Sequence, residues 1–160
     1  MEISRAFSCL RGMNLHMDEW NFLCYNTLTN KNWRLLTMEK IFTPDAPAAI
    51  GPYSQGMTFC NLVFSSGQIP VNPATGEIAG DDITAQAEQS CKNVAAVLAA
   101  GGASMENVIK TTCFLADMAD FAAFNAVYAK YFVSNPARSC VAVKTLPKNV
   151  LCEIEAIAHK

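Results

Sequence analysis

Charged residues are scarce in this sequence, and histidine is almost absent. Charged residues make up 16% of the 160 residues and hydrophobic ones 51%, and the two histidines are His16 and His159. Without histidines or cysteines clustered at ligand spacing, we expect no metal site. Twelve basic residues are outweighed by 14 acidic ones, and the pI is about 5.6. Because nucleic-acid affinity rests mainly on basic side chains that neutralise phosphates, no nucleic-acid partner is expected.

Several familiar catalytic motifs are also missing. The sequence has no G-x-S-x-G nucleophile elbow, no phosphate-binding G-x-x-x-x-G-K-[ST] loop and no dinucleotide-binding G-x-G-x-x-G. Neither histidine is an obvious base for a serine or cysteine nucleophile, since His159 is penultimate and His16 precedes the regular part of the chain. No membrane span is expected either. These absences argue against a Ser-His hydrolase, a nucleotide-dependent enzyme and a membrane partner.

Cysteine is present, but not in a pattern typical of disulfides. There are seven cysteines, none paired as C-x-x-C, and most lie in apolar runs where a free thiol packs as a small hydrophobe. An odd number without paired spacing favours free thiols in a reducing compartment. We therefore expect a cytoplasmic protein.

The chain divides into an irregular beginning and one regular domain. Residues 1–37 hold both tryptophans without sustained apolar periodicity, and we predict an N-terminal extension that is disordered or not translated, with translation starting at Met38. A mitochondrial presequence is the alternative, and its acidic residues disfavour it. Residues 38–160 form the predicted domain.

Apolar periodicity in this domain predicts an α+β fold, with one mixed sheet and two helices. Strand patterns cover residues 57–64, as a hairpin turning at Asn61, and residues 108–115, 138–146 and 151–158. One helix is predicted from an Asp81 or Asp82 cap to Gly101-Gly102, and another from Asp117 or Asp120 to Asn135-Pro136.

Two helices on one face of the sheet leave the other face bare. Its apolar members are expected to include some of Val141, Val143, Ile154 and Ala156. A small domain with so large an apolar share has difficulty covering this surface alone. We therefore expect a homo-oligomer in which another subunit covers the sheet.

Arginine and glutamate on the C-terminal strands are the main candidates for chemistry. Arg138 begins an apolar strand, and a guanidinium can bind a carboxylate through two parallel hydrogen bonds. Glu153 and Glu155 are two residues apart and share a strand face, so one of them could position water. The alternatives are an arginine that reaches to solvent and two solvated carboxylates.

Two turns and a cysteine add weaker candidates. Tyr53 follows a rigid Gly-Pro turn, and Ser66 and Gly67 end an apolar strand where a ligand could approach the backbone. Cys140 lies two residues after Arg138 on the same strand face. The alternative for the two segments is ordinary turn formation, and packing is the favoured role of the Cys140 thiol unless it has a basic neighbour.

Four segments, in order and at matching spacing, resemble the RidA/YjgF family of reactive intermediate deaminases. They are Ala-Pro-Ala-Ala-Ile-Gly-Pro-Tyr-Ser-Gln (46–55), Ser-Gly-Gln-Ile-Pro (66–70), Pro-Ala-Arg-Ser-Cys-Val (136–141) and Glu-Ile-Glu-Ala-Ile-Ala (153–158). Together they span nearly the whole chain from Met38 onwards. The segment 133–135 is shorter than this family leads one to expect, which bears on the cleft rim and on substrate size.

The resemblance implies a chorismate-mutase-like fold and a homotrimer with active sites in the clefts between subunits. It also implies hydrolysis of 2-imino and enamine acids, such as 2-iminopropanoate and 2-iminobutanoate, to 2-keto acids and ammonia without a cofactor. By similarity, Arg138 would hold the substrate carboxylate and Glu153 would place the water. The implied substrate-binding residues are Tyr53, Ser66, Gly67, Asn125 and Cys140.

Two other functions compete with this enzyme hypothesis. One is a regulatory protein on the same trimeric scaffold that binds a small carboxylate without turnover. The other is the RNA-directed activity sometimes attributed to relatives, which the acidic pI disfavours.

Overall fold

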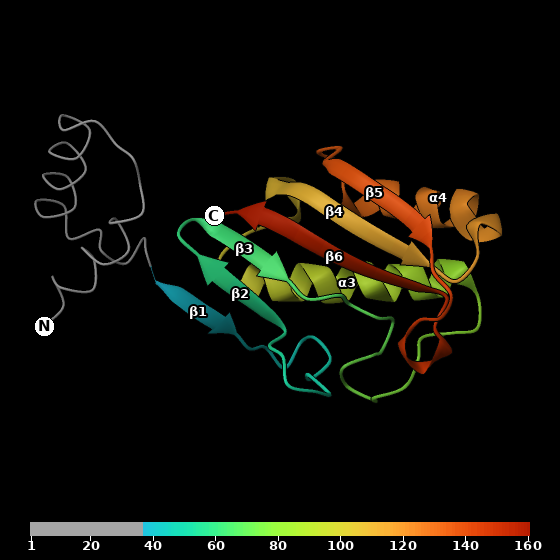
Figure 1. Cartoon of the computed structure of the whole chain (residues 1–160), viewed down its shortest axis with the longest axis horizontal. Helices are drawn as coiled ribbons and strands as arrows, with labels where there is room; N and C mark the ends of the chain where they lie inside the picture. The colour runs from blue at the N-terminus through green and yellow to red at the C-terminus, as the bar shows by residue number, and fades with distance from the viewer. Residues whose placement is uncertain (1–36) are drawn as a thin grey trace, which may run out of the picture.

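A computed structural model describes residues 37–160, so the predictions for residues 1–36 lie outside the described residues. In the described part, six strands form one mixed sheet in the order β1-β2-β3-β6-β4-β5 (Figure 1). The strands are β1 (Met38–Ile41), β2 (Gly56–Phe59), β3 (Leu62–Ser65), β4 (Val108–Leu115), β5 (Ala137–Ala142) and β6 (Cys152–His159).

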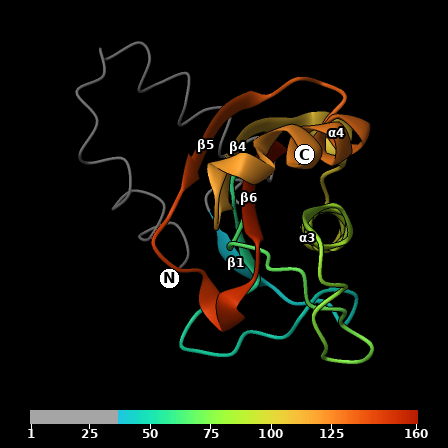
Figure 2. The same ribbon diagram turned by 90° about the vertical axis from the view of Figure 1, so that its right-hand side faces the viewer.

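Two α-helices of the described chain, α3 (Ile83–Ala100) and α4 (Phe121–Tyr131), cover the same face of the sheet (Figure 2). Short 3-10 helices occur at η2 (Met105–Asn107), η3 (Met118–Asp120) and η4 (Pro147–Asn149). This arrangement confirms the predicted α+β architecture. No helix within residues 37–160 is long and apolar enough to cross a membrane.

The strands pair antiparallel except at one edge. β6 lies centrally, antiparallel to both β3 and β4, while β5 pairs parallel with β4. A parallel neighbour requires a crossover connection, and α4 supplies it between β4 and β5. The edge strand β5 carries Arg138, and the central strand β6 carries Glu153.

The first helix follows the sequence prediction closely. Asp82 caps α3 by accepting hydrogen bonds from the backbone N–H groups of Thr84 (2.8 Å) and Ala85 (3.0 Å). The chain leaves the helix through Gly101 and Gly102, and Gly102 has φ +85°, a conformation that glycine adopts without strain. Along the side of α3 that faces the sheet, residues recur at helical spacing and are all buried: Ile83, Ala87, Ser90, Cys91, Val94, Leu98 and Gly101.

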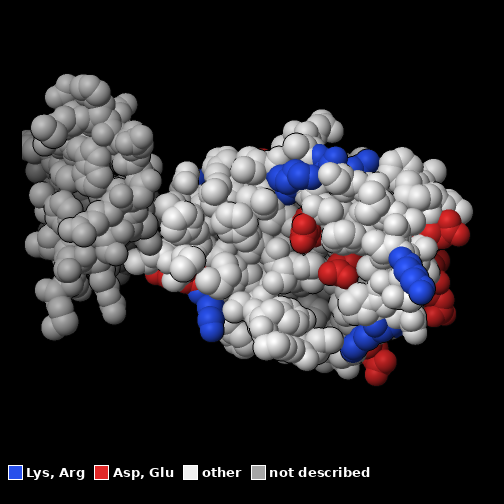
Figure 3. Space-filling view, viewed as in Figure 1, with Lys and Arg blue, Asp and Glu red and all other residues white. Residues whose placement is uncertain are grey.

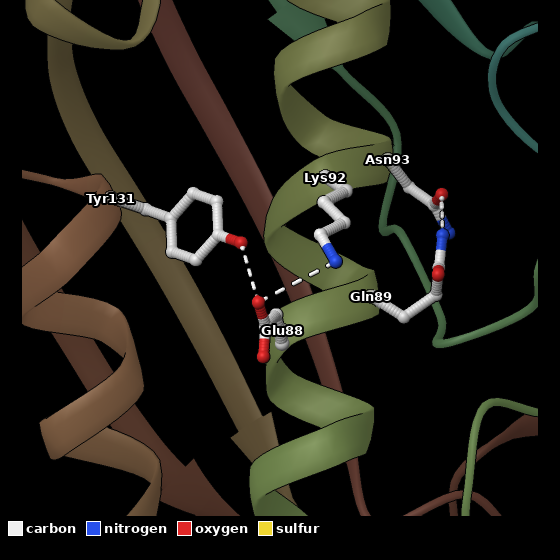
Figure 4. Close-up of polar contacts among 5 residues, drawn as sticks. All are labelled: Glu88, Gln89, Lys92, Asn93 and Tyr131. Carbon is white, nitrogen blue, oxygen red and sulfur yellow. Dashed lines mark hydrogen bonds and ion pairs between the residues drawn. The ribbon is translucent and has the colours of Figure 1, made fainter.

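Polar contacts join α3 to the second helix. The Tyr131 hydroxyl of α4 donates to Glu88 Oε1 of α3 at 3.3 Å, and Lys92 forms an ion pair with the same carboxylate at 3.4 Å (Figure 4). The buried side of α4 consists of Phe124, Val127 and Tyr128. The two helices therefore pack as one layer over the sheet.

Asn93, fully buried on α3, holds a connecting loop in place. Its Nδ2 donates to the backbone carbonyls of Ile69 and Val71, both at 2.9 Å. Its Oδ1 accepts a hydrogen bond from Gln89 Nε2 at 2.8 Å (Figure 4). The loop that follows β3 is thus fixed against the helix layer.

Four details differ from the sequence prediction. The second helix was expected to run to Asn135-Pro136, but α4 ends at Tyr131. The strand β1 was not predicted, because four residues with three exposed side chains give no clear alternation. The strand expected over 138–146 ends at Ala142. Ile154 and Ala156 face the helices and are buried, whereas Val141 lies on the bare face and is 47% exposed.

Candidate functional site

Arg138 and Glu153 extend from opposite faces of the sheet. Arg138 pairs with Thr111 of β4, whose side chain is buried beneath the helices. Glu153 pairs with Phe114, three residues further along β4, so its side chain lies on the bare face. Within one chain the two predicted catalytic residues are therefore not brought together.

The guanidinium of Arg138 rests against α4. Its Nη1 donates to Asn125 Oδ1 at 2.8 Å, and its central carbon lies 4.6 Å from the ring centroid of Tyr128 and 5.6 Å from that of Phe121. The side chain is exposed at the edge of the sheet. The structure thus places two predicted site residues, Arg138 and Asn125, in direct contact.

Cys140 lies on the helix side of β5, like Arg138. It is half-buried and pairs with Cys113 of β4. Burial raises the pKa of the Cys140 thiol, while Arg138 acts in the opposite direction and offsets only part of the effect. The side chain is accordingly a neutral thiol at neutral pH, which suits packing or a hydrogen bond better than nucleophilic attack.

Glu153 and Gly67 form a second group on the bare face. A Cβ at position 67 would overlap Oε1 of Glu153, so only glycine leaves room for this carboxyl group. Gln68 fixes the adjacent backbone, since its N–H donates to the Ile154 carbonyl at 2.8 Å and its carbonyl accepts from the Ile154 N–H at 3.2 Å. Glu153 is therefore held beside an accessible stretch of backbone.

The carboxyl group of Glu153 has an elevated pKa. Desolvation by burial is the main cause, and the charge of Glu155 on the same face adds to it. A carboxyl group with a raised pKa is better suited to accept and return a proton near neutral pH than an ordinary glutamate.

A pocket of about 260 Å³ opens beside this group. Tyr53 and Gly67 line it together with Gln68, and Lys148 lies at its wall. Viewed from the bare face, the surface is hollowed between the sheet and the loops below it, and acidic atoms lie near the centre of the face (Figure 3). The pocket thus joins two of the predicted binding residues.

Ser66 supports this pocket rather than lining it. Its hydroxyl donates to the Ser54 carbonyl at 2.6 Å, and its N–H donates to the Gln55 carbonyl at 2.9 Å. Both bonds tie the end of β3 to the segment that carries Tyr53.

The sequence analysis did not predict the aromatic contacts of Arg138 or most of the residues that line the pocket. Tyr128 was not predicted as a site residue, yet its ring lies under the Arg138 guanidinium. Its position three residues after Asn125 was an available signal, since such residues share a helix face. No comparable signal indicated Lys148.

Chemically, Arg138 with Asn125 can bind an anion, and Glu153 beside Gly67 can accept a proton or position a water molecule. In residues 37–160, no three His, Cys, Asp or Glu side chains are grouped so as to hold a metal ion.

Comparison with known proteins identifies the family to which this chain belongs. The family model described as Endoribonuclease L-PSP matches residues 43–160. The chain belongs to this family. A 2-iminobutanoate/2-iminopropanoate deaminase of Escherichia coli is 52% identical over 122 residues, which cover 74% of this chain and 94% of the relative. The resemblance to the RidA/YjgF family is thereby confirmed.

Names within the Endoribonuclease L-PSP family vary. A Lactococcus lactis protein named for a regulatory role, AldR, is 56% identical over 123 residues, covering 76% of this chain and 98% of that protein. The crystal structure of E. coli TdcF with bound serine superimposes with a TM-score of 0.73 at 49% identity, covering 76% of this chain and 98% of TdcF. Family membership therefore confirms the fold, while the activity has to be argued from the site.

Proposed function

We propose that this protein hydrolyses reactive 2-imino and enamine acids, such as 2-iminopropanoate and 2-iminobutanoate, to 2-keto acids and ammonia in the cytoplasm. The name of the E. coli relative supports this substrate class. The observation that carries the proposal is the fixed guanidinium of Arg138, which can bind the carboxylate common to these substrates. Glu153, with its raised pKa, supplies the second group that the reaction needs.

The proposed active site lies between subunits of a homotrimer. Because Arg138 and Glu153 lie on opposite faces of one sheet, a site that uses both requires two chains. We assign substrate binding to residues from the two chains, namely Tyr53, Gly67, Asn125 and Cys140, with Ser66 holding the backbone of the pocket in place. No cofactor, nucleic acid or membrane takes part in this proposal.

The reaction begins with the substrate carboxylate bound to Arg138. Water attacks the carbon of the protonated imine while Glu153 accepts a proton from that water. The resulting carbinolamine takes the proton on nitrogen, the C–N bond breaks and ammonia leaves. The hydroxyl group loses its proton to Glu153 as the C=O bond of the keto acid forms. Orientation and an aimed water suffice, because imines already hydrolyse in water.

The test couples a pyridoxal-phosphate-dependent dehydratase, which releases the imine, to measurement of the keto acid formed. We expect Arg138→Ala to lower kcat/KM about 100-fold, because it removes a charge-assisted double hydrogen bond to the substrate. Lys92→Ala, which removes an exposed cation on α3, is the matched control and should behave like the unmodified protein. An unchanged rate for Arg138→Ala would overturn the assignment.

The alternative is a non-catalytic regulatory protein that binds a small carboxylate in the same cleft. The name of the Lactococcus lactis relative, which refers to a regulator, supports this alternative. It predicts binding of a keto acid that depends on Arg138, without faster decay of the imine. The RNA-directed activity named in the family description would require salt-dependent RNA binding, which the excess of acidic over basic residues disfavours.

A further inference from the structure

The Arg138 guanidinium lies over an aromatic ring that has no place in the reaction described above. The ring of Tyr128 is 4.6 Å from the central carbon of the guanidinium, and Asn125 accepts a hydrogen bond from Nη1 at 2.8 Å. The ring faces one side of the guanidinium while Asn125 fixes its edge. Together they restrict rotation of a long, exposed side chain.

Tyr128 is itself held rigidly. Its hydroxyl shares a buried 2.7 Å hydrogen bond with the hydroxyl of Thr111, and its ring stacks on Phe132 with centroids 4.2 Å apart and planes 20° apart. Burial raises the pKa of Tyr128, so the phenol stays neutral and acts on Arg138 through its ring rather than as an anion. The core of the domain thus fixes the ring, and the ring supports the arginine.

We propose that Tyr128, fixed by Thr111, is a positioning residue that pre-orients Arg138 for the substrate carboxylate. The inference rests on the proposed function, in which Arg138 binds that carboxylate. A flexible arginine loses conformational freedom when it binds a ligand, and a pre-oriented one loses less. The ring also attracts the cation through its π face. Tyr128 therefore contributes to affinity without touching the substrate.

The direct test is Tyr128→Leu, assayed for imine hydrolysis. We expect KM to rise about tenfold, because a cation–π contact and the order it gives Arg138 are lost. The change in kcat should stay below about threefold, because the group that places water is untouched. Phe124→Leu is the matched control, since it removes another buried ring of α4 that stacks at a tilt on Tyr128. It should lower stability without raising KM.

The conservative variant Tyr128→Phe separates positioning from stability. It keeps the π face but leaves the buried Thr111 hydroxyl without its partner. We expect a lower melting temperature with KM within about twofold of the unmodified protein, since the ring remains. A KM as high as that of Tyr128→Leu would contradict the role of the ring.

Binding of 2-oxobutanoate, followed by calorimetry, distinguishes failure of this inference from failure of the proposed function. If the unmodified protein neither hydrolyses imines nor binds the keto acid, the proposed function fails. The positioning role alone fails under a different result. In that case the unmodified protein hydrolyses imines and binds the keto acid, and Arg138→Ala does neither. Tyr128→Leu, however, has the same KM and the same affinity as Phe124→Leu. The supporting outcome is an affinity about tenfold weaker in Tyr128→Leu and unchanged in Phe124→Leu.

Nuclear magnetic resonance can test the position of the Arg138 guanidinium in the unmodified protein, so this test does not depend on whether a variant folds. A guanidinium held over the Tyr128 ring should give an Arg138 Nε–H signal displaced by the ring current from the average position of arginines. A signal at the average position of solvent-exposed arginines would overturn the inference even if Tyr128→Leu did not fold.

Discussion

Glu153 combines two influences that raise the pKa of its carboxyl group. Burial against the Gly67 backbone is the larger, and the like charge of Glu155 is the second. As a base it works only when ionised, so the acid limb of the rate profile should lie above the range of an ordinary glutamate. Its contribution to stability has the opposite sign: stability is favoured while Glu153 is protonated and declines as pH rises through the raised pKa.

Replacing Glu155 tests this assignment at the level of a single charge. Glu155→Gln removes the like charge, so the pKa of Glu153 should fall and the acid limb of kcat/KM should move to lower pH. The limb should still lie above the usual value of 4.5, because desolvation remains. The measurement is a pH profile of imine hydrolysis. A limb unmoved by the substitution would show that another group controls the profile.

At the scale of elements, the loop after β3 depends on α3. Asn93→Leu keeps the branched shape of the side chain but removes the donor shared by the carbonyls of Ile69 and Val71, of which the Ile69 carbonyl retains only the Val71 N–H. Because lost buried hydrogen bonds and a larger apolar side chain are both costly, we expect a loss of about 3 kcal/mol in the free energy of unfolding, measured by urea denaturation. Both loop residues also line the pocket, so KM should rise as well.

The neighbouring Lys92→Ala is the control for this prediction. Lys92 is exposed and takes part only in a solvent-screened ion pair with Glu88 among the contacts of the described chain. It should change the free energy of unfolding by less than about 0.5 kcal/mol. An equal loss in both variants would mean that the effect comes from the helix and not from the bound loop.

Helices and strands differ in how well the sequence predicts them, and the reason is physical. The limits of α3 follow from the Asp82 cap and the terminal glycines, which act within a few residues. The face on which Arg138 emerges depends on the pairing of β5 with β4, which shifts all side chains together if it changes by one residue. The sequence therefore predicted the candidates Arg138 and Glu153, but not that one sheet separates them.

At the scale of the whole molecule, the sheet presents a bare face with many apolar side chains. Those that alternate onto it are Met57, Phe59, Leu62, Phe64, Phe114, Val141 and Ile157. This surface adjoins the Glu153 carboxyl group, so a subunit that covers it would also enclose the proposed site. Burial of apolar area would then supply both assembly and a water-restricted cleft.

Mixing two inactive variants tests whether Arg138 and Glu153 act from different chains. Arg138→Ala and Glu153→Gln should each have little activity when every subunit carries the same substitution. In the proposed trimer assembled from equal amounts of both, an intact arginine meets an intact glutamate at about a quarter of the interfaces, so about a quarter of the normal activity should return. Activity is measured after co-expression or joint refolding, with separately folded and then mixed variants as the control. If both residues served the same site from one chain, no mixture would contain an intact site, and no activity would return.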